Sequence, residues 1–279
     1  MTLQGSLRSV VWLIVFMLSV TSAAGQGPKF SNVDLCNGQA RASSDSQIMG
    51  CTALITSDAS SPQVLAVAYN NRGNAFSTKG EYELAIRDYD ESIKLAPNYD
   101  KPFNNRGVAY QKKGQYDLAI QDFDAAIKIN QNYANAFANR AETYQKIGNY
   151  ARASEDFDEA VQLQPSLKIV WNERCWTRAL TGRLQLALAD CNEAIRTVPD
   201  DAAAFDSRGL VYLKLGQWEL AIADYNSALR LTPRLPTALY GRGFAKIKAG
   251  NSKSGNADFV AAKNLDQNIE TEFTSYGLH

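Results

Sequence analysis

Histidine, clustered cysteines and nucleotide-binding glycine patterns are scarce or missing in this chain of 279 residues. The one histidine is His279 at the end of the sequence, and the four cysteines have no CxxC spacing. General-base catalysis, zinc binding and phosphate binding each depend on one of these features. We therefore expect no enzymatic activity, no cofactor and no metal site.

An excess of charge of either sign is also lacking. Lys and Arg number 29, Asp and Glu number 29, and the formal net charge is zero. Nucleic acids and anionic lipid surfaces attract proteins through excess positive charge. The balanced composition therefore gives no reason to expect nucleic acid as a partner.

Long apolar runs are absent apart from Val10–Val20 near the N-terminus. This run follows Arg8 and is followed by small residues up to Ala24, which is the layout of a secretory signal peptide. A retained membrane anchor is the alternative, but a spanning helix needs about 20 apolar residues. We expect residues 1–24 to be a signal peptide, and the protein to be exported, periplasmic or secreted, with no membrane span after cleavage.

The main feature of the chain is an internal repeat with a period of 34 residues. Three residue types keep this spacing through six copies, which is typical of a solenoid built from helix-turn-helix units. They are the arginines Arg72, Arg106, Arg140, Arg174, Arg208 and Arg242, the glycines Gly80, Gly114, Gly148, Gly182, Gly216 and Gly250, and the aspartates Asp88, Asp122, Asp156, Asp190, Asp224 and Asp258.

With its first position at Ala66, the repeat resembles the tetratricopeptide repeat (TPR). Position 8 is small, position 20 is Ala in five copies, position 24 is aromatic in five and position 32 is Pro in four. The resemblance implies an all-α fold, a right-handed α-solenoid of six TPR helix-turn-helix repeats with an N-terminal helical cap. The repeats would span 66–99, 100–133, 134–167, 168–201, 202–235 and 236–269, followed by a tail at 270–279.

Helix geometry gives a physical reason for the pattern. At 100° per residue, positions 4, 7, 8 and 11 share one face of the first helix, and positions 17, 20, 21, 24, 27 and 28 share one face of the second. Small residues at positions 8 and 20 let the two helices approach closely, and glycine at position 15 ends the first helix. Neighbouring repeats must stack to bury these faces.

Residues 25–65 precede the repeats and carry two of the cysteines. We expect helices at Val33–Ala40 and Gln47–Thr56, the second with Ser44 or Asp45 as its N-cap. A terminal repeat must cover an exposed apolar face, so we interpret this hairpin as the N-terminal cap. Chains with such a repeat and a cysteine-bearing cap look like small TPR proteins of alphaproteobacteria.

The cysteines form two pairs in the sequence. Cys36 and Cys51 lie 15 residues apart in the cap, and a bridge between them would close its hairpin. Cys175 and Cys191 occupy positions 8 and 24 of the fourth repeat, where other copies mostly have a small residue and an aromatic ring. We interpret this second pair as a disulfide that replaces the packing contact, with two packed free thiols as the alternative.

The repeated arginines and aspartates flank the apolar faces of the two helices. An Arg guanidinium at such an edge needs a partner. An Asp from the second helix of the same or a neighbouring repeat would supply it, so we interpret both sets as a structural ion-pair ladder. Binding of a polyanion by the arginines is disfavoured because each has an aspartate available.

Partner binding is expected on the concave face, which the first helices line in TPR proteins. A row of carboxamides can pair with an extended peptide backbone, because each donates and accepts hydrogen bonds. Those at position 6 resemble the asparagine ladder of some TPR proteins, and a solvated polar face without a partner is the alternative. The carboxamides are Asn70, Asn71, Asn74, Asn104, Asn105, Asn139 and Asn172.

Toward the C-terminus this face becomes apolar, which is typical of an interface with aromatic anchors. The alternative is that part of it packs against the tail Ile269–His279, which either covers the last repeat or enters the groove of a second molecule. The apolar residues are Ile169, Trp176, Leu180, Leu210, Leu213, Tyr240, Phe244 and Ile247, of which Trp176, Leu210, Tyr240 and Phe244 are the expected contacts.

These observations favour a protein interaction module or scaffold that binds a peptide or protein partner, in extended conformation, in the concave groove. A self-associating scaffold is the alternative, a homodimer built through the apolar half of the groove and the tail.

Overall fold

The computed structural model describes residues 31–39, 43–58 and 60–278, which form helices joined by turns and loops and contain no strands. The expected signal peptide lies outside the described residues. The described helices are α1 (Asn32–Cys36), α2 (Ser44–Ile55), α3 (Pro62–Thr78), α4 (Tyr82–Leu95), α5 (Asp100–Lys112), α6 (Tyr116–Ile129), α7 (Ala134–Lys146), α8 (Tyr150–Leu163), α9 (Lys168–Leu180), α10 (Leu184–Thr197), α11 (Ala202–Lys214), α12 (Trp218–Leu231), α13 (Pro236–Lys248), α14 (Ser252–Leu265) and α15 (Ile269–Ser275).

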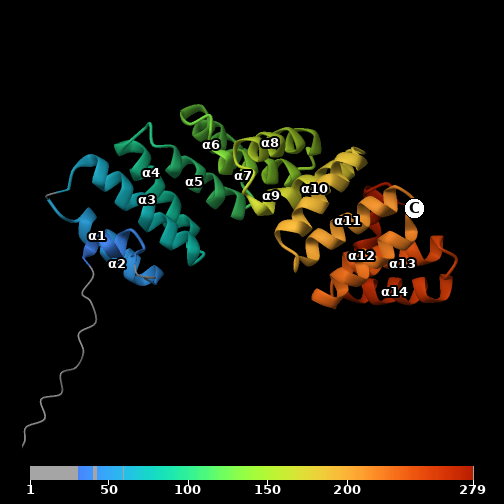
Figure 1. Cartoon of the computed structure of the whole chain (residues 1–279). Helices are drawn as coiled ribbons and strands as arrows, with labels where there is room; N and C mark the ends of the chain where they lie inside the picture. Colours follow the sequence, from blue (N-terminus) through green and yellow to red (C-terminus); the bar gives the residue numbers. More distant parts are fainter. Residues whose placement is uncertain (1–30, 40–42, 59, 279) are drawn as a thin grey trace, which may run out of the picture.

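Six helix pairs, α3 and α4 through α13 and α14, form an elongated array with α1 and α2 at one end and the C-terminus at the other (Figure 1). Each helix packs mainly against its neighbours in sequence. Glycine ends the first helix of each pair as expected, and Gly80 has a left-handed φ of 77°. The expectation of an α-solenoid of helix-turn-helix repeats is confirmed.

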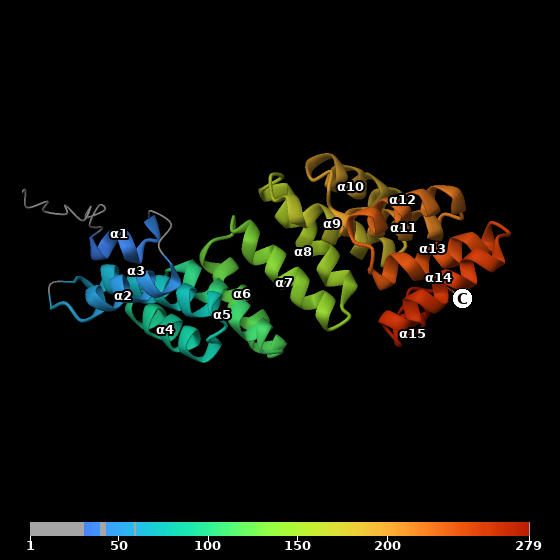
Figure 2. The same cartoon turned by 90° about the horizontal axis from the view of Figure 1, so that it is seen from below.

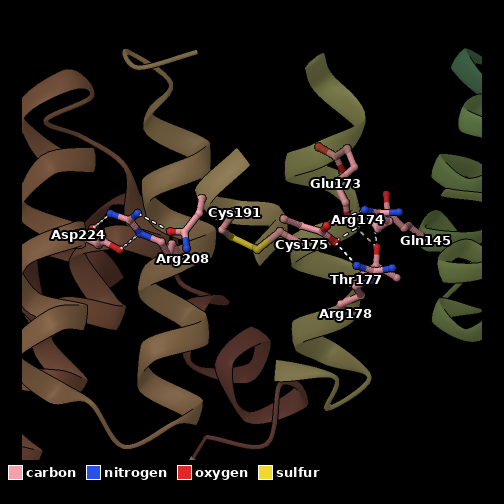
Figure 3. Close-up of a disulfide and its surroundings, with 11 residues drawn as sticks. Gln145, Glu173, Arg174, Cys175, Thr177, Arg178, Cys191, Arg208 and Asp224 are labelled. Atoms are coloured by element: carbon pink, nitrogen blue, oxygen red, sulfur yellow. Dashed lines mark hydrogen bonds and ion pairs between the residues drawn. A yellow bond between two sulfur atoms is a disulfide. The ribbon is translucent and has the colours of Figure 1, made fainter. Parts of the chain in front are cut away.

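Small residues at position 8 give room to the aromatic ring at position 24. A Cβ at Gly73 would lie 2.6 Å from Tyr89, and one at Gly107 would lie 2.7 Å from Phe123. In the fourth repeat, a disulfide joins Cys175 of α9 to Cys191 of α10 (Figure 3), and the two Cα atoms are 5.3 Å apart. The covalent bond therefore occupies the place of the ring contact.

The arginine at position 7 links two repeats. Arg140 binds both carboxylate oxygens of Asp156 in its own repeat, at 2.7 Å each, and also contacts Asp124 of the preceding repeat. Its guanidinium lies 5.5 Å from the centre of the Phe137 ring. All six arginines make the same two-oxygen pair with the aspartate at position 23: Arg72 with Asp88, Arg106 with Asp122, Arg140 with Asp156, Arg174 with Asp190, Arg208 with Asp224, and Arg242 with Asp258.

The cap hairpin takes the place of a preceding repeat. Arg72 donates to Thr52 of α2 at 3.1 Å. The other arginines of the ladder donate instead to a side chain of the preceding repeat. A disulfide between Cys36 and Cys51 joins α1 to α2. The expected helix bounds were wrong in detail: α1 ends at Cys36, and α2 begins earlier because Ser43, rather than Ser44 or Asp45, caps it by accepting from the Ser46 N–H.

The tail folds back onto its own chain. Helix α15 packs beside α13 and α14 at the C-terminal end (Figure 2). Ile269 and Phe273 are buried there, and the Phe273 ring lies 4.7 Å from the Tyr240 ring. Of the arrangements expected for the tail, the structure therefore contains the intramolecular one.

Candidate functional site

Asparagine side chains of the first three repeats bond to one another. The Asn105 amide donates to the side-chain oxygen of Asn70 at 3.0 Å, and the Asn139 amide donates to that of Asn104 at 2.9 Å. Within each of the first two repeats, the residue at position 5 donates to its neighbour at position 6, as Asn104 does to Asn105 at 3.1 Å. These bonds form a continuous carboxamide chain along α3, α5 and α7.

The carboxamide chain begins at the cap. Asn71 donates to the side-chain oxygen of Asn37 at 3.2 Å, which continues the row beyond the first repeat. Asn70 and Asn104 are buried within it, whereas Asn71, Asn105 and Asn139 remain partly exposed. The exposed members are therefore the ones in a position to meet a partner.

Further along, the polar row changes in composition. Gln145 of α7 donates to Thr177 of α9 at 2.7 Å, as Gln111 does to Thr143 one repeat earlier (Figure 3 shows the first pair). Burial, together with the charge of the neighbouring Glu173, raises the pKa of the Glu142 carboxyl. Two carboxylates, Glu142 and Glu173, therefore lie near each other in the middle of the row.

The C-terminal segment covers part of the apolar surface expected to bind a partner. Leu210 and Tyr240 are 4% and 7% exposed. Tyr276, just after α15, meets Trp176 edge to face, with ring centres 6.0 Å apart. Trp176 and Phe244 are half-buried. Because Leu210 and Tyr240 are buried, they become accessible to a partner only if α15 moves away.

Asn74 and Asn172 differ in how their side chains are used. Asn74 accepts hydrogen bonds from Asn105 at 2.9 Å and from the Tyr89 hydroxyl at 2.9 Å. Asn172 is 8% exposed, and its side-chain oxygen has no hydrogen-bond partner among the described residues. Asn70 in the first repeat accepts from position 6 of the repeat that follows it. The equivalent position for Asn172 is Ser207.

Sequence reasoning missed Asp206 of α11. It occupies position 5 of the fifth repeat, where three other copies have Asn. The replacement of Asn by Asp at this position is the feature of the sequence that could have indicated it. One carboxylate oxygen accepts from Thr237 at 2.7 Å, and the other is buried without a partner. Burial and the charge of Glu272 raise the pKa of Asp206 from 3.8 to about 7.

This shift predicts a pH effect on stability. Between about pH 4 and 7 the folded chain keeps a proton on Asp206 that the unfolded chain releases, so the contribution of this residue to stability falls as pH rises. The unfolding free energy of the wild type minus that of Asp206→Asn should therefore be smaller at pH 7.5 than at pH 4.5. Urea unfolding at both pH values measures it, and a difference that does not change with pH would contradict this prediction.

The described residues contain neither a metal-ligand cluster nor a membrane-spanning helix. No group of three or more His, Cys, Asp or Glu side chains there could hold a metal ion. None of the helices in that part of the chain is long and apolar enough to cross a membrane.

Comparison with known proteins agrees with the repeat architecture. The family model described as "Tetratricopeptide repeat" matches residues 66–99, 101–133 and 134–167, and the one described as "TPR repeat" matches 209–250. No curated protein has a significantly similar sequence.

Solved structures share the fold at low sequence identity. YrrB, a TPR protein with an unusual peptide-binding site, has a TM-score of 0.58 and 22% identity over 69% of this chain and 97% of its own. A TPR protein of Parabacteroides merdae has a TM-score of 0.60 and 18% identity over 88% and 95%. PilF of Pseudomonas aeruginosa has a TM-score of 0.64 and 15% identity over 77% and 98%. The matched TPR models, which together cover more than half of the chain, show that it belongs to the tetratricopeptide-repeat family.

Proposed function

We propose that the protein is an interaction module that binds an extended segment of a partner protein along α3, α5, α7 and α9. The observation that carries the proposal is the carboxamide chain defined above. Its hydrogen bonds hold the asparagines in place before a partner arrives, which reduces the conformational entropy lost on binding. No catalytic role is proposed.

The carboxamide chain keeps hydrogen-bonding capacity for a partner. An Asn side chain offers two N–H groups and two acceptor lone pairs. Among the described residues, Asn139 uses one N–H, toward Asn104, and Asn71 uses one N–H and one acceptor site. A cavity of about 240 Å³ lies beside Asn74 and Asn105. An extended backbone, with alternating N–H and C=O groups, matches such a row.

Export is part of the proposal. The signal-like segment and the two cysteine pairs, both of which form disulfides in the structure, support it, because disulfides persist in oxidising compartments such as the periplasm.

Selection of peptides from a random display library tests the groove. The selected peptides should bind the wild type, and Asn105→Ala combined with Asn139→Ala should weaken them about tenfold, the loss of a few hydrogen bonds. Asn98→Ala, at an exposed turn between α4 and α5, is the matched control. Peptides that bind the double variant as tightly as the wild type would contradict the groove assignment.

Self-association is the second candidate, and it requires α15 to leave its own groove for that of another molecule. Sedimentation of the purified protein separates the two: the main proposal expects a monomer over a wide concentration range, whereas a dimer that dissociates on deletion of residues 269–279 would favour exchange of the tail.

A further inference from the structure

A cavity of about 140 Å³ lies between α9, α11, α12, α13 and α15. Its walls include Trp176, Leu210 and Phe273, and its polar groups include Asp206, Tyr225 and Glu272. A second cavity of about 300 Å³ adjoins it through Trp176, Asp206 and Ser207, and Asn172 lines that one. Among the asparagines expected to bind a partner, Asn172 lines the second cavity, and none lines the smaller one.

Differences from the first repeat leave polar atoms unpaired at the smaller cavity. In the first repeat the side-chain oxygen at position 5 accepts from position 6 of the next repeat, as Asn70 does from Asn105. For Asp206 that donor position is Gly241, which has no side chain. One oxygen of Asp206 is accordingly buried without a hydrogen-bond partner among the described residues.

The hydroxyl of Tyr225 is unpaired for a parallel reason. Tyr89, its equivalent in the first repeat, donates to Asn74 at position 9 at 2.9 Å, whereas position 9 of the fifth repeat is Leu210. Tyr225 is fully buried, and its hydroxyl has no partner among the described residues. Gly241 leaves the space for it, because a Cβ there would lie 2.4 Å from the hydroxyl oxygen.

The cavity has an excess of negative charge. Asp206 of α11 and Glu272 of α15 both line it, and none of the described residues that line it is basic. An unpaired buried polar atom lowers folding stability, because its hydrogen bonds to water are lost without replacement. A ligand that supplies N–H donors and a positive charge would remove this cost.

We propose that this cavity binds an alkylammonium group, as carried by a lysine side chain or by a small free amine. Its N–H groups donate to the free oxygen of Asp206 and to the Tyr225 hydroxyl, and Glu272 balances the charge. The methylene stem lies against Trp176 and Leu210. This site is separate from the carboxamide chain, so the proposal of an amine site does not depend on the proposed peptide groove.

Titration calorimetry with n-butylammonium tests the proposal, with 1-butanol as the neutral probe of similar shape. The wild type should bind butylammonium saturably and 1-butanol far more weakly. Asp206→Asn should weaken butylammonium binding by about tenfold or more, the loss of a charge-assisted hydrogen bond. Glu272→Gln should weaken it less, and Asp117→Asn, at an exposed carboxylate of α6, should leave it unchanged.

The pH profile gives a second readout that a structural role of Asp206 would not produce. The ionisable side chains that line the cavity are Asp206, Tyr225, Glu272 and Tyr276, and the adjoining cavity adds Lys146 and Glu173, while Trp176 of α9 and Thr237 of α13 carry no charge. Because burial raises the pKa of Asp206 to about 7, butylammonium should bind more tightly at pH 8 than at pH 6. In Asp206→Asn that difference should largely disappear.

Capped lysine separates the two sources of the ligand. Binding of capped lysine at least as tightly as butylammonium would assign the cavity to a partner's lysine side chain, and binding of butylammonium alone would assign it to a free amine. Absence of saturable binding of either, equal binding of 1-butanol, or an unchanged affinity of Asp206→Asn would overturn the proposal and leave a cavity that holds only water.

Discussion

Replacing Arg140 by methionine should destabilise α7 and α8 by about 3 kcal/mol, because it leaves a buried carboxylate without its counter-charge. Asp156 is 6% exposed, and both its oxygens accept from Arg140. Hydrogen exchange of the α7 and α8 amides measures the effect, since repeat arrays unfold locally.

The fourth repeat offers a matched comparison. Asp190 accepts from Arg174, and it also accepts from Arg178 at 2.7 Å. Arg174→Met should therefore destabilise its repeat less than Arg140→Met destabilises its own. Combining Arg140→Met with Asp156→Leu should recover much of the loss, because an apolar pair replaces the unpaired charge. Equal losses in Arg140→Met and Arg174→Met, with no recovery in the double variant, would contradict the ladder's proposed role.

The second large effect is expected from the disulfide in the fourth repeat. Replacing both Cys175 and Cys191 by alanine should cost about 3 kcal/mol through the unfolded chain, and more through the cavity left behind. Both cysteines are fully buried. Thermal unfolding of the variant and of the wild type, each without reductant, measures the difference.

The chain itself supplies the control for this prediction. Glycine at position 8 with phenylalanine at position 24 packs well in the second repeat, as Gly107 and Phe123 show. Cys175→Gly combined with Cys191→Phe should therefore be more stable than the double alanine variant and insensitive to reductant at this site. Equal instability of the two variants would show that the disulfide does more than replace a ring contact.

The regular part of the fold could be predicted from the sequence because the same residue types recur at the same positions of each repeat. Glycine at position 15 ends the first helix, and Arg72 and Asp88 lie 16 residues apart, the spacing that joins the two helices of one repeat. The position of Cys175 and Cys191 at a known contact likewise indicated their pairing.

The candidate site was less predictable, since it depends on contacts between repeats. Nothing in the residue types shows that Asn139 bonds to Asn104 rather than to solvent. The place of α15 depends on its packing against Tyr240 and Trp176, residues far away in sequence. The unpaired oxygen of Asp206 arises only because Gly241 stands opposite, so neither residue alone gives the signal.

Hydrogen exchange of the protein with and without a library-selected peptide tests the central claim most directly, because it locates the bound segment on the helices. We predict protection of residues in α3, α5, α7 and α9 that is lost when Asn105 and Asn139 are both alanine. Protection confined to the second helices α4, α6 and α8, or the same protection in the double variant, would contradict binding along the carboxamide chain.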